Sequence, residues 1–366
     1  MMGYASPLGY GLVDYRLYMP ETWFEEGYAD RRQKCLVPSG IRFKNKNTML
    51  SEMINEAIAS GVLPAKYVGV DSSYGTDSKF LDSLPDSIIY FADIRSNCLV
   101  FAERPTFSIP PYSGKGRKPT IEKPSSAPIT VKKLIEQSPH SWEYVVLGIG
   151  AKGPIIVQDI CLPVVEVRDD RPGKDVWLYA RKMDDGSIKY ALCNAPADAT
   201  IADIRKPALM RWSIEQCFEE CKGYLGMGHY ETRSWVGWRR HMLLTLIAHL
   251  FIIKLRIELS KTPSTPNATP YIEKAVPLEE FVQAYEQMNE GKEIDHPDIM
   301  LMPSKPQQFM TIGMVQKLIV SVFPKIGLAV KEVSYRLYKA KSAFDSHSQA
   351  TMHKILKLRA SPCFLH

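Results

Sequence analysis

Residues 47–61 show the clearest helical pattern of apolar and polar positions in the first part of the chain. The apolar residues stand at i, i+3, i+4 and i+7 and are Leu50, Met53, Ile54 and Ala57. This spacing places the four side chains on one face of an α-helix, and Gly61 is a typical stop signal. We therefore predict an amphipathic helix.

A longer helix is predicted to begin near Thr200 or Asp203, either of which can cap its N-terminus. Its pattern continues to about residue 225 along an apolar stripe of Ile214, Phe218, Cys221 and Leu225. At 3.6 residues per turn these side chains share one narrow face. The stripe predicts a helix that packs on a neighbouring element.

A further helix is predicted over residues 235–260. Its most apolar run, Met242 to Ile253, is 12 residues long and contains His249. A membrane span needs about 20 apolar residues, so we expect a buried helix and no membrane association.

Short β-rich runs lie between these helices. The first covers residues 9–18, and another, residues 66–70, leads directly into Asp71. After a short helix near residues 78–84, strands are predicted at 88–92 and 97–101. A carboxylate at the C-terminal end of a buried strand is typical of an α/β sheet, in which ligand sites lie beyond the strand ends.

The middle of the chain has a different pattern. Residues 104–129 are rich in Pro, Ser, Gly and Lys and predict a linker, followed by a short helix at 130–137. Five strands are then predicted, at 142–149, 153–161, 163–168, 175–181 and 187–193, with turns at 171–173 and 184–186. Asp169-Asp170 is most simply a solvated hairpin turn. These strands indicate an antiparallel β insertion between two halves of an α/β domain.

Composition narrows the class of protein without deciding it. The chain has 366 residues and seven cysteines at irregular spacing, and its N-terminus lacks the basic and apolar regions of a signal peptide. We expect several domains and a cytoplasmic location. Residues 310–360 carry nine Lys/Arg and two acidic residues, so most of the net charge of +6 is concentrated there. This indicates either a polyanionic partner or a solvated helix face.

The predicted helix after residue 200 carries the first candidate site. Arg211, Glu215 and Lys222 fall together on the flank of its apolar stripe. A carboxylate between two cations suits a site that holds a divalent cation and a phosphate, although surface pairs at such spacing contribute only tenths of a kcal/mol. Asp71 and Glu215 could share a metal site, because two-metal phosphodiester chemistry uses carboxylates from different elements. Mg²⁺ prefers such oxygen ligands. The alternative for Asp71 is a capping or turn residue.

Cations and aromatic residues alternate in residues 229–241. Arg233, Trp238, Arg239 and Arg240 could contact phosphates and stack on bases. The alternative is a pair of core tryptophans, with Trp235 the clearer case, flanked by solvated arginines. The pattern alone leaves both interpretations open.

Cys217 and Cys221, with His229 and His241, could suggest zinc. The cysteines are four residues apart on a helix, and Cys221 belongs to the apolar stripe. Structural zinc sites usually have more closely paired ligands, so we expect buried thiols.

Together these motifs resemble bacterial DDE transposases of the insertion-sequence group whose signature is Tyr-x2-Arg-x3-Glu-x6-Lys. Arg211, Glu215 and Lys222 match the spacing of its last three members, whereas Ala208 occupies the Tyr position. The closer resemblance is to insertion-sequence family 701. It is carried by residues 9–23, 70–75, 211–235 and 237–241 and extends to about residue 255.

This resemblance implies a ribonuclease-H-like α/β core interrupted by a mainly antiparallel β insertion and followed by a helical C-terminal region. It implies Mg²⁺-dependent (Mn²⁺ possible) cleavage and joining of double-stranded DNA at transposon ends and target, with a homodimer on DNA possible and an association with the nucleoid when bound. Asp71 and Glu215 would be the second and third catalytic and metal-binding carboxylates. Arg211 and Lys222 would support the DNA backbone or the active site.

The first catalytic Asp of that family lies in an Asp-Glu-Thr-Gly-like motif, which this sequence does not contain. Asp14 lies on the strand before the 47–61 helix and is not assigned to the triad. We therefore expect an N-terminally truncated transposase, weak or inactive as this chain alone. The alternatives are a non-catalytic DNA-binding protein that inhibits intact transposase, or a misfolded remnant.

The expected domains are 1–103, the first part of the core without its first strand; 104–198, the linker and β insertion; 199–261, the second, helical part of the core; and 262–366, a Pro-rich linker and basic helical region.

Overall fold

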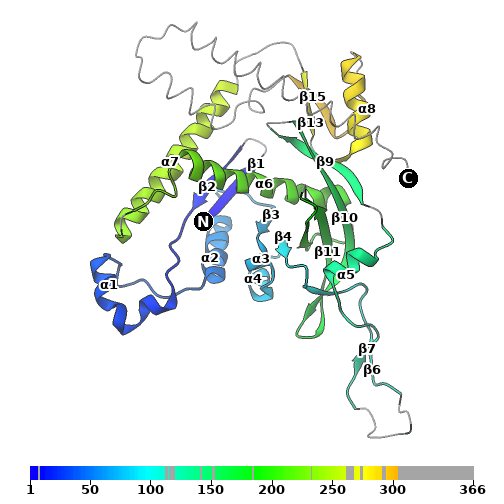
Figure 1. Cartoon of the computed structure of the whole chain (residues 1–366), viewed down its shortest axis with the longest axis horizontal. Helices are drawn as coiled ribbons and strands as arrows, with labels where there is room; N and C mark the ends of the chain where they lie inside the picture. Colours follow the sequence, from blue (N-terminus) through cyan, green and yellow to red (C-terminus); the bar gives the residue numbers. More distant parts are fainter. Residues whose placement is uncertain are drawn as a thin grey trace. The chain divides into compact units, whose positions relative to one another are not determined.

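The computed structural model describes residues 1–303 except 7–8, 112–113, 115–119, 141, 151–152, 184, 232, 261–267, 273–274 and 291–293 (Figure 1). The chain divides into two compact units, each made of separate stretches. Unit 1 comprises Met1–Leu63, Val146–Ile156 and Leu209–His366, and unit 2 comprises Pro64–Val145 and Val157–Ala208.

Unit 1 opens with a β-hairpin. Strands β1 (Met2–Ser6) and β2 (Gly9–Asp14) pair antiparallel. The sequence predicted one strand over 9–18; the observed strand ends at Asp14, and its partner β1 was not predicted. Glycines interrupt the alternation of both strands, and Gly3 allows close packing, because a Cβ there would lie 2.9 Å from the side chain of Ile214. Gly11 lies beside His249, where a Cβ would be in ordinary van der Waals contact, 3.9 Å from Nδ1.

The predicted amphipathic helix is confirmed as α2 (Lys46–Ala59). The Asn45 side chain caps it by accepting the backbone N–H of Thr48 at 2.7 Å. Met53 and Ile54 are buried, and Gly61 follows in the left-handed conformation with φ of 67°. The segment before α2 forms η1 (Glu21–Phe24), η2 (Glu26–Tyr28) and α1 (Ala29–Lys34).

The two long helices lie where the sequence predicted them, as α6 (Ile201–Tyr224) and α7 (Trp235–Ser260). Thr200 and Asp203 form a reciprocal cap at the start of α6: the Thr200 hydroxyl donates to Asp203 at 2.6 Å, and the Asp203 N–H donates back at 3.2 Å. Ser234 caps α7 by accepting the N–H of Gly237 at 3.0 Å.

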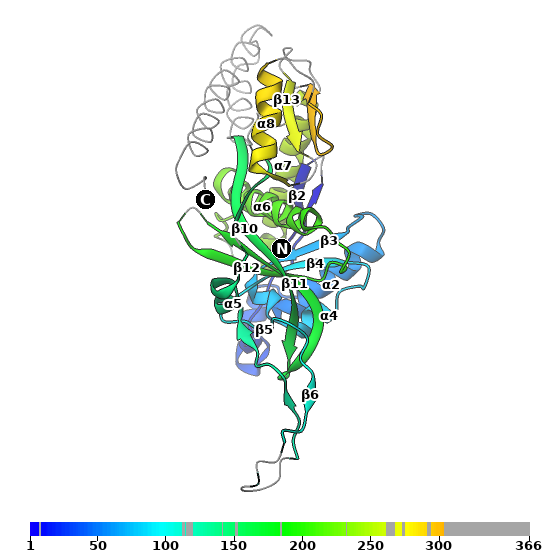
Figure 2. The same cartoon turned by 90° about the vertical axis from the view of Figure 1, so that its right-hand side faces the viewer.

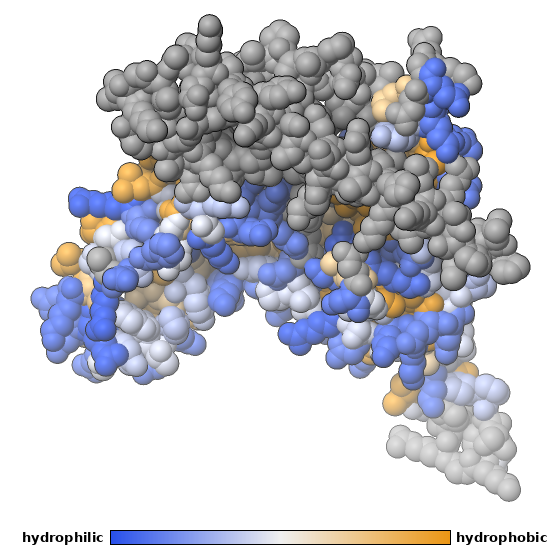
Figure 3. Space-filling model, turned by 45° about the horizontal axis from the view of Figure 1, so that its top comes forward, coloured by the Kyte–Doolittle hydropathy of each residue, from blue (hydrophilic) through white to orange (hydrophobic). Residues whose placement is uncertain are grey.

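Helix α7 is only partly buried, which corrects the expectation of a buried helix. Met242, Thr245, His249, Ile252 and Ile253 are buried. Five apolar side chains on another face are exposed, namely Leu243, Leu244, Ile247, Leu250 and Phe251. Hydrophobic residues reach the surface on the side of Figure 3 that α7 occupies in Figure 1. Among the described helices, α7 is also the one long and apolar enough to cross a membrane, over Trp235–Leu255, judged by length and composition alone.

Unit 2 is built on a mixed sheet with the strand order β10-β11-β12-β4-β3. Strand β3 (Tyr67–Val70) is parallel to β4 (Ile89–Ile94), and β12 (Ile188–Cys193) is antiparallel to β4. The short helices α3 (Ser72–Gly75) and α4 (Ser78–Asp82) follow β3. The predicted α/β arrangement around Asp71 is therefore confirmed.

The predicted antiparallel strands continue this same sheet. They are β9 (Glu143–Gly150), β10 (Gly153–Arg168), β11 (Arg171–Lys182) and β12. The sequence predicted two strands, 153–161 and 163–168, but β10 is continuous, with Pro163 opposite Trp177. Asp169 and Asp170 form the hairpin turn with φ of 48° and 59°, as expected, whereas the predicted turn at 171–173 is the start of β11. The pairing of β10 with β11 therefore extends through the residues of the predicted turn.

The remaining elements of unit 2 are short. Strands β5 (Leu99–Phe101) and β8 (Ile129–Thr130) pair with each other, and β5 also pairs with β10. Helix α5 (Val131–Gln137) lies where it was predicted. Within the predicted linker, β6 (Phe107–Ser108) and β7 (Lys123–Pro124) form a narrow ribbon that projects away from the main sheet in both views (Figures 1 and 2).

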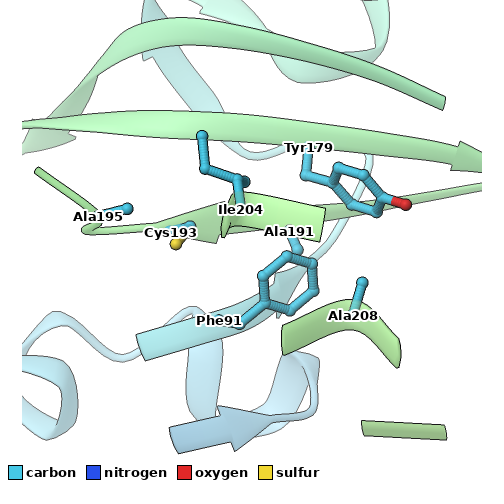
Figure 4. Packing of buried hydrophobic residues seen from close by; sticks show 7 residues of the cluster. All are labelled: Phe91, Tyr179, Ala191, Cys193, Ala195, Ile204 and Ala208. Atoms are coloured by element: carbon cyan, nitrogen blue, oxygen red, sulfur yellow. The ribbon is translucent and has the colours of Figure 1, made fainter. Parts of the chain in front are cut away.

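One core cluster of unit 2 lies between the sheet and the first turns of α6. Its buried members are Phe91, Tyr179, Ala191, Cys193, Ala195, Ile204 and Ala208 (Figure 4). Residues at alternate strand positions share a face, so Ala191 and Cys193 of β12 both contribute to it. The rings of Phe91 and Tyr179 meet edge to face, with their centroids 5.4 Å apart.

The end of the described chain combines strands with a helix, whereas the sequence predicted a Pro-rich linker followed by a mainly helical region. It contains β13 (Ala268–Ile272), β14 (Val276–Pro277), α8 (Leu278–Asn289) and β15 (Ile299–Pro303), and β13 pairs antiparallel with β15. The basic stretch at 310–360 lies outside the described residues.

Candidate functional site

Asp71 lies at the C-terminal end of β3, where the sequence placed it. Its side chain is exposed and caps α3: one carboxylate oxygen accepts the backbone N–H of Ser73 at 2.8 Å and the Ser73 hydroxyl at 2.5 Å. The capping role considered from the sequence is therefore real. It is compatible with a ligand role as well, because a carboxylate has about four lone-pair positions.

Tight packing fixes the turn that follows Asp71. The N–H of Gly75 donates to the carbonyl of Asp71 at 2.9 Å. A Cβ on Gly75 would lie 2.1 Å from the carbonyl oxygen of Asp93 on β4. No side chain fits at that distance, so the glycine lets α3 lie directly against β4 and thereby positions Asp71.

The second candidate carboxylate, Glu215, is an exposed residue of α6 in unit 1. Lys222 is exposed on the same helix, two turns further along. Arg211 lies within α6, but its side chain is outside the described part of the structure. Asp71 belongs to unit 2, so its pairing with Glu215 rests on the sequence motifs.

The opposite side of α6 is buried within unit 1. Cys217 and Cys221 form a hydrophobic cluster with Leu12 of β2, with Met227 and with Met242 of α7. The predicted stripe is confirmed, since Phe218 and Leu225 pack against the same cluster. Cys217 and Cys221 are buried, as expected: both have 0% exposure.

A buried polar group, which was not predicted from the sequence, lies beside these cysteines. His249 Nε2 contacts Glu220 Oε2 at 3.2 Å, and the Tyr10 hydroxyl donates to Glu220 Oε1 at 2.8 Å. Cys217 Sγ lies 3.8 Å from Nε2 and 3.9 Å from Nδ1 of His249. A hydrogen bond with Cys221, together with burial, raises the pKa of the Cys217 thiol far above its usual value. The only available sign in the sequence was a histidine inside an apolar run.

The loop from α6 to α7 is held at several points. Trp235 N–H donates to the Cys35 carbonyl at 2.7 Å, and the Tyr230 hydroxyl donates to the Ser234 carbonyl at 2.7 Å. His241 Nε2 lies 3.1 Å from the Gly226 carbonyl. His241 is therefore used to hold the loop, and His229 is exposed.

This loop and the segment after β2 enclose a pocket of about 370 Å³. Its lining is largely aromatic and apolar and comprises Leu17, Tyr18, Met19, Pro20, Trp23, Cys35, Val37, Tyr230, Arg233, Ser234, Trp235 and Trp238. Trp238 also meets Tyr15 edge to face at 5.6 Å. Trp235 is half-buried and lines the pocket, so the expectation of a core residue is only partly met.

Three predicted DNA-binding arginines surround this region. Arg233 lines the pocket and is exposed, and Arg239 and Arg240 are exposed in the first turns of α7. The Tyr15 hydroxyl donates to the Arg239 carbonyl at 3.0 Å, which fixes the backbone from which the two side chains extend. An aromatic pocket beside exposed guanidinium groups can hold a base and its phosphates.

Residues 5–153 match the family model of the DDE superfamily endonucleases. This match supports a DDE transposase-type family and a transposase-like nuclease function, for which the substrate is DNA. The mixed α/β structure with its large mixed sheet is consistent with a ribonuclease-H-like DDE fold. No curated protein matches the chain.

DDE superfamily nucleases generally use divalent metal ions. The matched residues include Asp71, and α6 lies beyond them. Asp71 and Glu215 both present exposed carboxylates, and such hard oxygen donors suit Mg²⁺ or Mn²⁺. Each carboxylate is therefore an oxygen donor of the kind that such metal ions bind.

Proposed function

We propose that this chain is a DDE-type transposase, of the kind found in insertion-sequence family 701, that cleaves and joins DNA strands at insertion-sequence ends. The main support is the family match over residues 5–153 together with the Arg211-x3-Glu215-x6-Lys222 spacing on α6. The match covers Asp71 and its strand, and the spacing supplies Glu215, so the two observations concern different parts of the chain.

In this proposal Asp71 and Glu215 hold the divalent cation, Mg²⁺ or Mn²⁺. The metal, when bound, helps to activate the attacking oxygen and stabilises the leaving oxygen of the phosphodiester. Lys222 and Arg211 contribute positive charge near the phosphate. The two hydrogen bonds that Ser73 donates hold one carboxylate oxygen of Asp71. They fix the orientation of this side chain before metal binds.

The pocket of unit 1 supplies a second set of contacts with the same DNA. Arg233, Arg239 and Arg240 neutralise phosphates, and Trp238 with its aromatic neighbours stacks on a base. These contacts are largely independent of sequence, and the specificity for a transposon end needs further contacts to base edges.

In the family that the chain resembles, a third carboxylate completes the metal site, and we assign no residue of this chain to it. Two of three carboxylates should retain the metal weakly. We expect slow cleavage of a cognate end in Mg²⁺ or Mn²⁺ by this chain alone.

The test compares Glu215→Ala with Glu219→Ala, since both glutamates are exposed on α6. Residual metal-dependent cleavage should be abolished by Glu215→Ala and by Asp71→Asn, and should survive Glu219→Ala. Robust cleavage that Glu215→Ala leaves unchanged would overturn the assignment of the site.

A second candidate function is favoured by the exposed arginines Arg233, Arg239 and Arg240: a non-catalytic DNA-binding protein that competes with intact transposase. It predicts binding of double-stranded DNA that weakens with salt, because phosphate contacts release counterions, and that does not depend on Mg²⁺. Electrophoretic shifts at two salt concentrations, with and without Mg²⁺, separate it from the enzyme. A homodimer on DNA and a nucleoid location remain predictions of both.

A further inference from the structure

Two cysteines of α6 and a histidine of α7 meet inside unit 1. Cys217 and Cys221 have 0% exposure and His249 has 1%. One ligand atom from each lies within 4.8 Å of the other two. Two thiols and an imidazole are the ligands that select zinc-like, thiol-binding metals over Mg²⁺. This chemistry differs from that of the carboxylates at Asp71 and Glu215.

The distances suit a metal ion. With Zn–S of about 2.3 Å and Zn–N of about 2.0–2.1 Å, neighbouring S and N ligands of a tetrahedral site are about 3.6 Å apart. Cys217 Sγ lies 3.9 Å from His249 Nδ1. Cys217 and His249 therefore need to approach by only a few tenths of an ångström to reach this spacing. All three ligand atoms lie within 4.8 Å of one another.

The surroundings of His249 supply a second line of support. Histidines that bind metals usually donate their other N–H to a carboxylate, which fixes the ring and its tautomer. Glu220 Oε2 lies 3.2 Å from His249 Nε2, and the Tyr10 hydroxyl fixes the other oxygen of Glu220 at 2.8 Å. With Nε2 donating to Glu220, Nδ1 is the ring nitrogen left to accept, and Cys217 Sγ lies 3.9 Å from Nδ1 and 3.8 Å from Nε2.

We propose that Cys217, Cys221 and His249 form a zinc site that joins α6 to α7. Glu220 and Tyr10 orient the histidine, and water or another small ligand completes the coordination. On binding, each thiol loses its proton to solvent as its sulfur takes the metal. The site ties the helix that carries Glu215 to the helix that carries Arg239 and Arg240, and its role is structural.

The proposal is tested on the full chain by measuring its metal content and by titrating the metal-free protein with Zn²⁺ and Co²⁺. We expect a single equivalent of Zn²⁺ per chain. Bound Co²⁺ should show thiolate-to-metal charge transfer in the near ultraviolet and visible bands of tetrahedral coordination. A chain that binds no Zn²⁺, or a Co²⁺ complex without the thiolate band, overturns the site.

Variants then locate the metal. Cys217→Ser, Cys221→Ser and His249→Gln should each lose Zn²⁺. Cys193→Ser should keep it, because Cys193 is equally buried but lies in the core of unit 2. If the double variant of Cys217 and Cys221 still binds one equivalent, or Cys193→Ser loses it, the metal lies elsewhere and the proposal fails.

A stability measurement covers variants that fold poorly. A chelator should lower the Tm of the unmodified chain, and added Zn²⁺ should restore it. An unchanged Tm on removal of bound zinc contradicts a structural role. Neither result depends on DNA cleavage, so failure of this site and failure of the proposed transposase function are distinguishable.

Discussion

At the scale of single residues, backbone packing behind Asp71 matters as much as the carboxylate itself. The strand β3 delivers Asp71, the Ser73 side chain and N–H hold one of its oxygens, and Gly75 brings α3 against β4. Each of these contacts is short-range and lies within unit 2. Together they define where a metal bound to Asp71 would lie relative to the sheet.

The first prediction concerns Gly75. Gly75→Ala should lower the free energy of unfolding by about 1–3 kcal/mol, the usual cost of overpacking a filled site, because the new Cβ would overlap the Asp93 carbonyl oxygen. Denaturant unfolding measures the change. Gly40→Ala is the control, since nothing lies within 4 Å of a Cβ there, and it should stay within about 0.5 kcal/mol. Equal effects of the two substitutions would contradict this packing argument.

A second residue-scale prediction concerns Arg205. Its guanidinium is buried and donates to Asp159 at 2.8 and 2.6 Å and to Glu143 at 2.7 Å. Arg205→Met should destabilise the protein by about 3–5 kcal/mol, because Asp159 is completely buried and would keep an unpaired charge. Calorimetry or denaturant unfolding measures it.

The control for Arg205 is an exposed ion pair in the same unit. Arg104 lies 2.9 Å from Asp175, and both side chains are largely solvated. Arg104→Met should cost about 0–1 kcal/mol. A loss at Arg205 as small as that at Arg104 would show that Asp159 is neutral or solvated in the folded chain.

At the scale of elements, α6 contributes to two separate hydrophobic clusters, one near its start and one further along. Its first turns cover the sheet of unit 2 through Ile204 and Ala208, and its later turns pack on β2 and α7 in unit 1. Glu215 and Lys222 lie on the exposed side of the later turns. Ala208, which stands at the Tyr position of the transposase signature, is a buried core residue here. Its small side chain belongs to the buried cluster between α6 and the sheet.

The prediction at this scale concerns the start of α7. Replacing both Arg239 and Arg240 by alanine should weaken DNA binding and reduce the slope of log K against log[salt] by about 1.8, since each lost phosphate contact removes about 0.9. Binding titrations at several salt concentrations measure the slope. Lys254→Ala, an exposed cation further along α7, is the control. A slope unchanged by the double substitution would remove these arginines from the interface.

At the scale of the whole molecule, two chemistries are kept apart by ligand type. Exposed carboxylates at Asp71 and Glu215 suit a hard cation for phosphodiester chemistry. The proposed zinc site uses buried sulfur and nitrogen. We therefore expect a zinc-selective chelator to lower the Tm without removing Mg²⁺ from solution. Omission of Mg²⁺ should stop cleavage without changing the Tm by more than a few degrees. Parallel activity and melting measurements check this pair of outcomes.

Much of the secondary structure could be predicted from local patterns. Helices α2, α6 and α7 could be predicted because the signals for a helix are local in sequence. The apolar periodicity, the caps and the stop signals all involve residues a few turns apart. Strand β3 and Asp71 were predicted from a short apolar run that ends in a carboxylate. Three features were not predicted: the hairpin partner β1, the continuous strand β10 and the exposed face of α7. Their formation depends on pairing or packing with residues far away in the sequence.

The sequence by itself determined the spacing of Arg211, Glu215 and Lys222 and the place of Asp71 after a strand, because covalent spacing on a regular element fixes such positions. Only the tertiary structure decided that Cys217 and Cys221 meet His249, while His241 holds a loop. It also decided that Trp238 and Arg233 line one pocket with residues 17–37. Contacts between elements depend on how helices and strands pack, and a histidine in an apolar run looks the same in sequence whichever neighbour it meets.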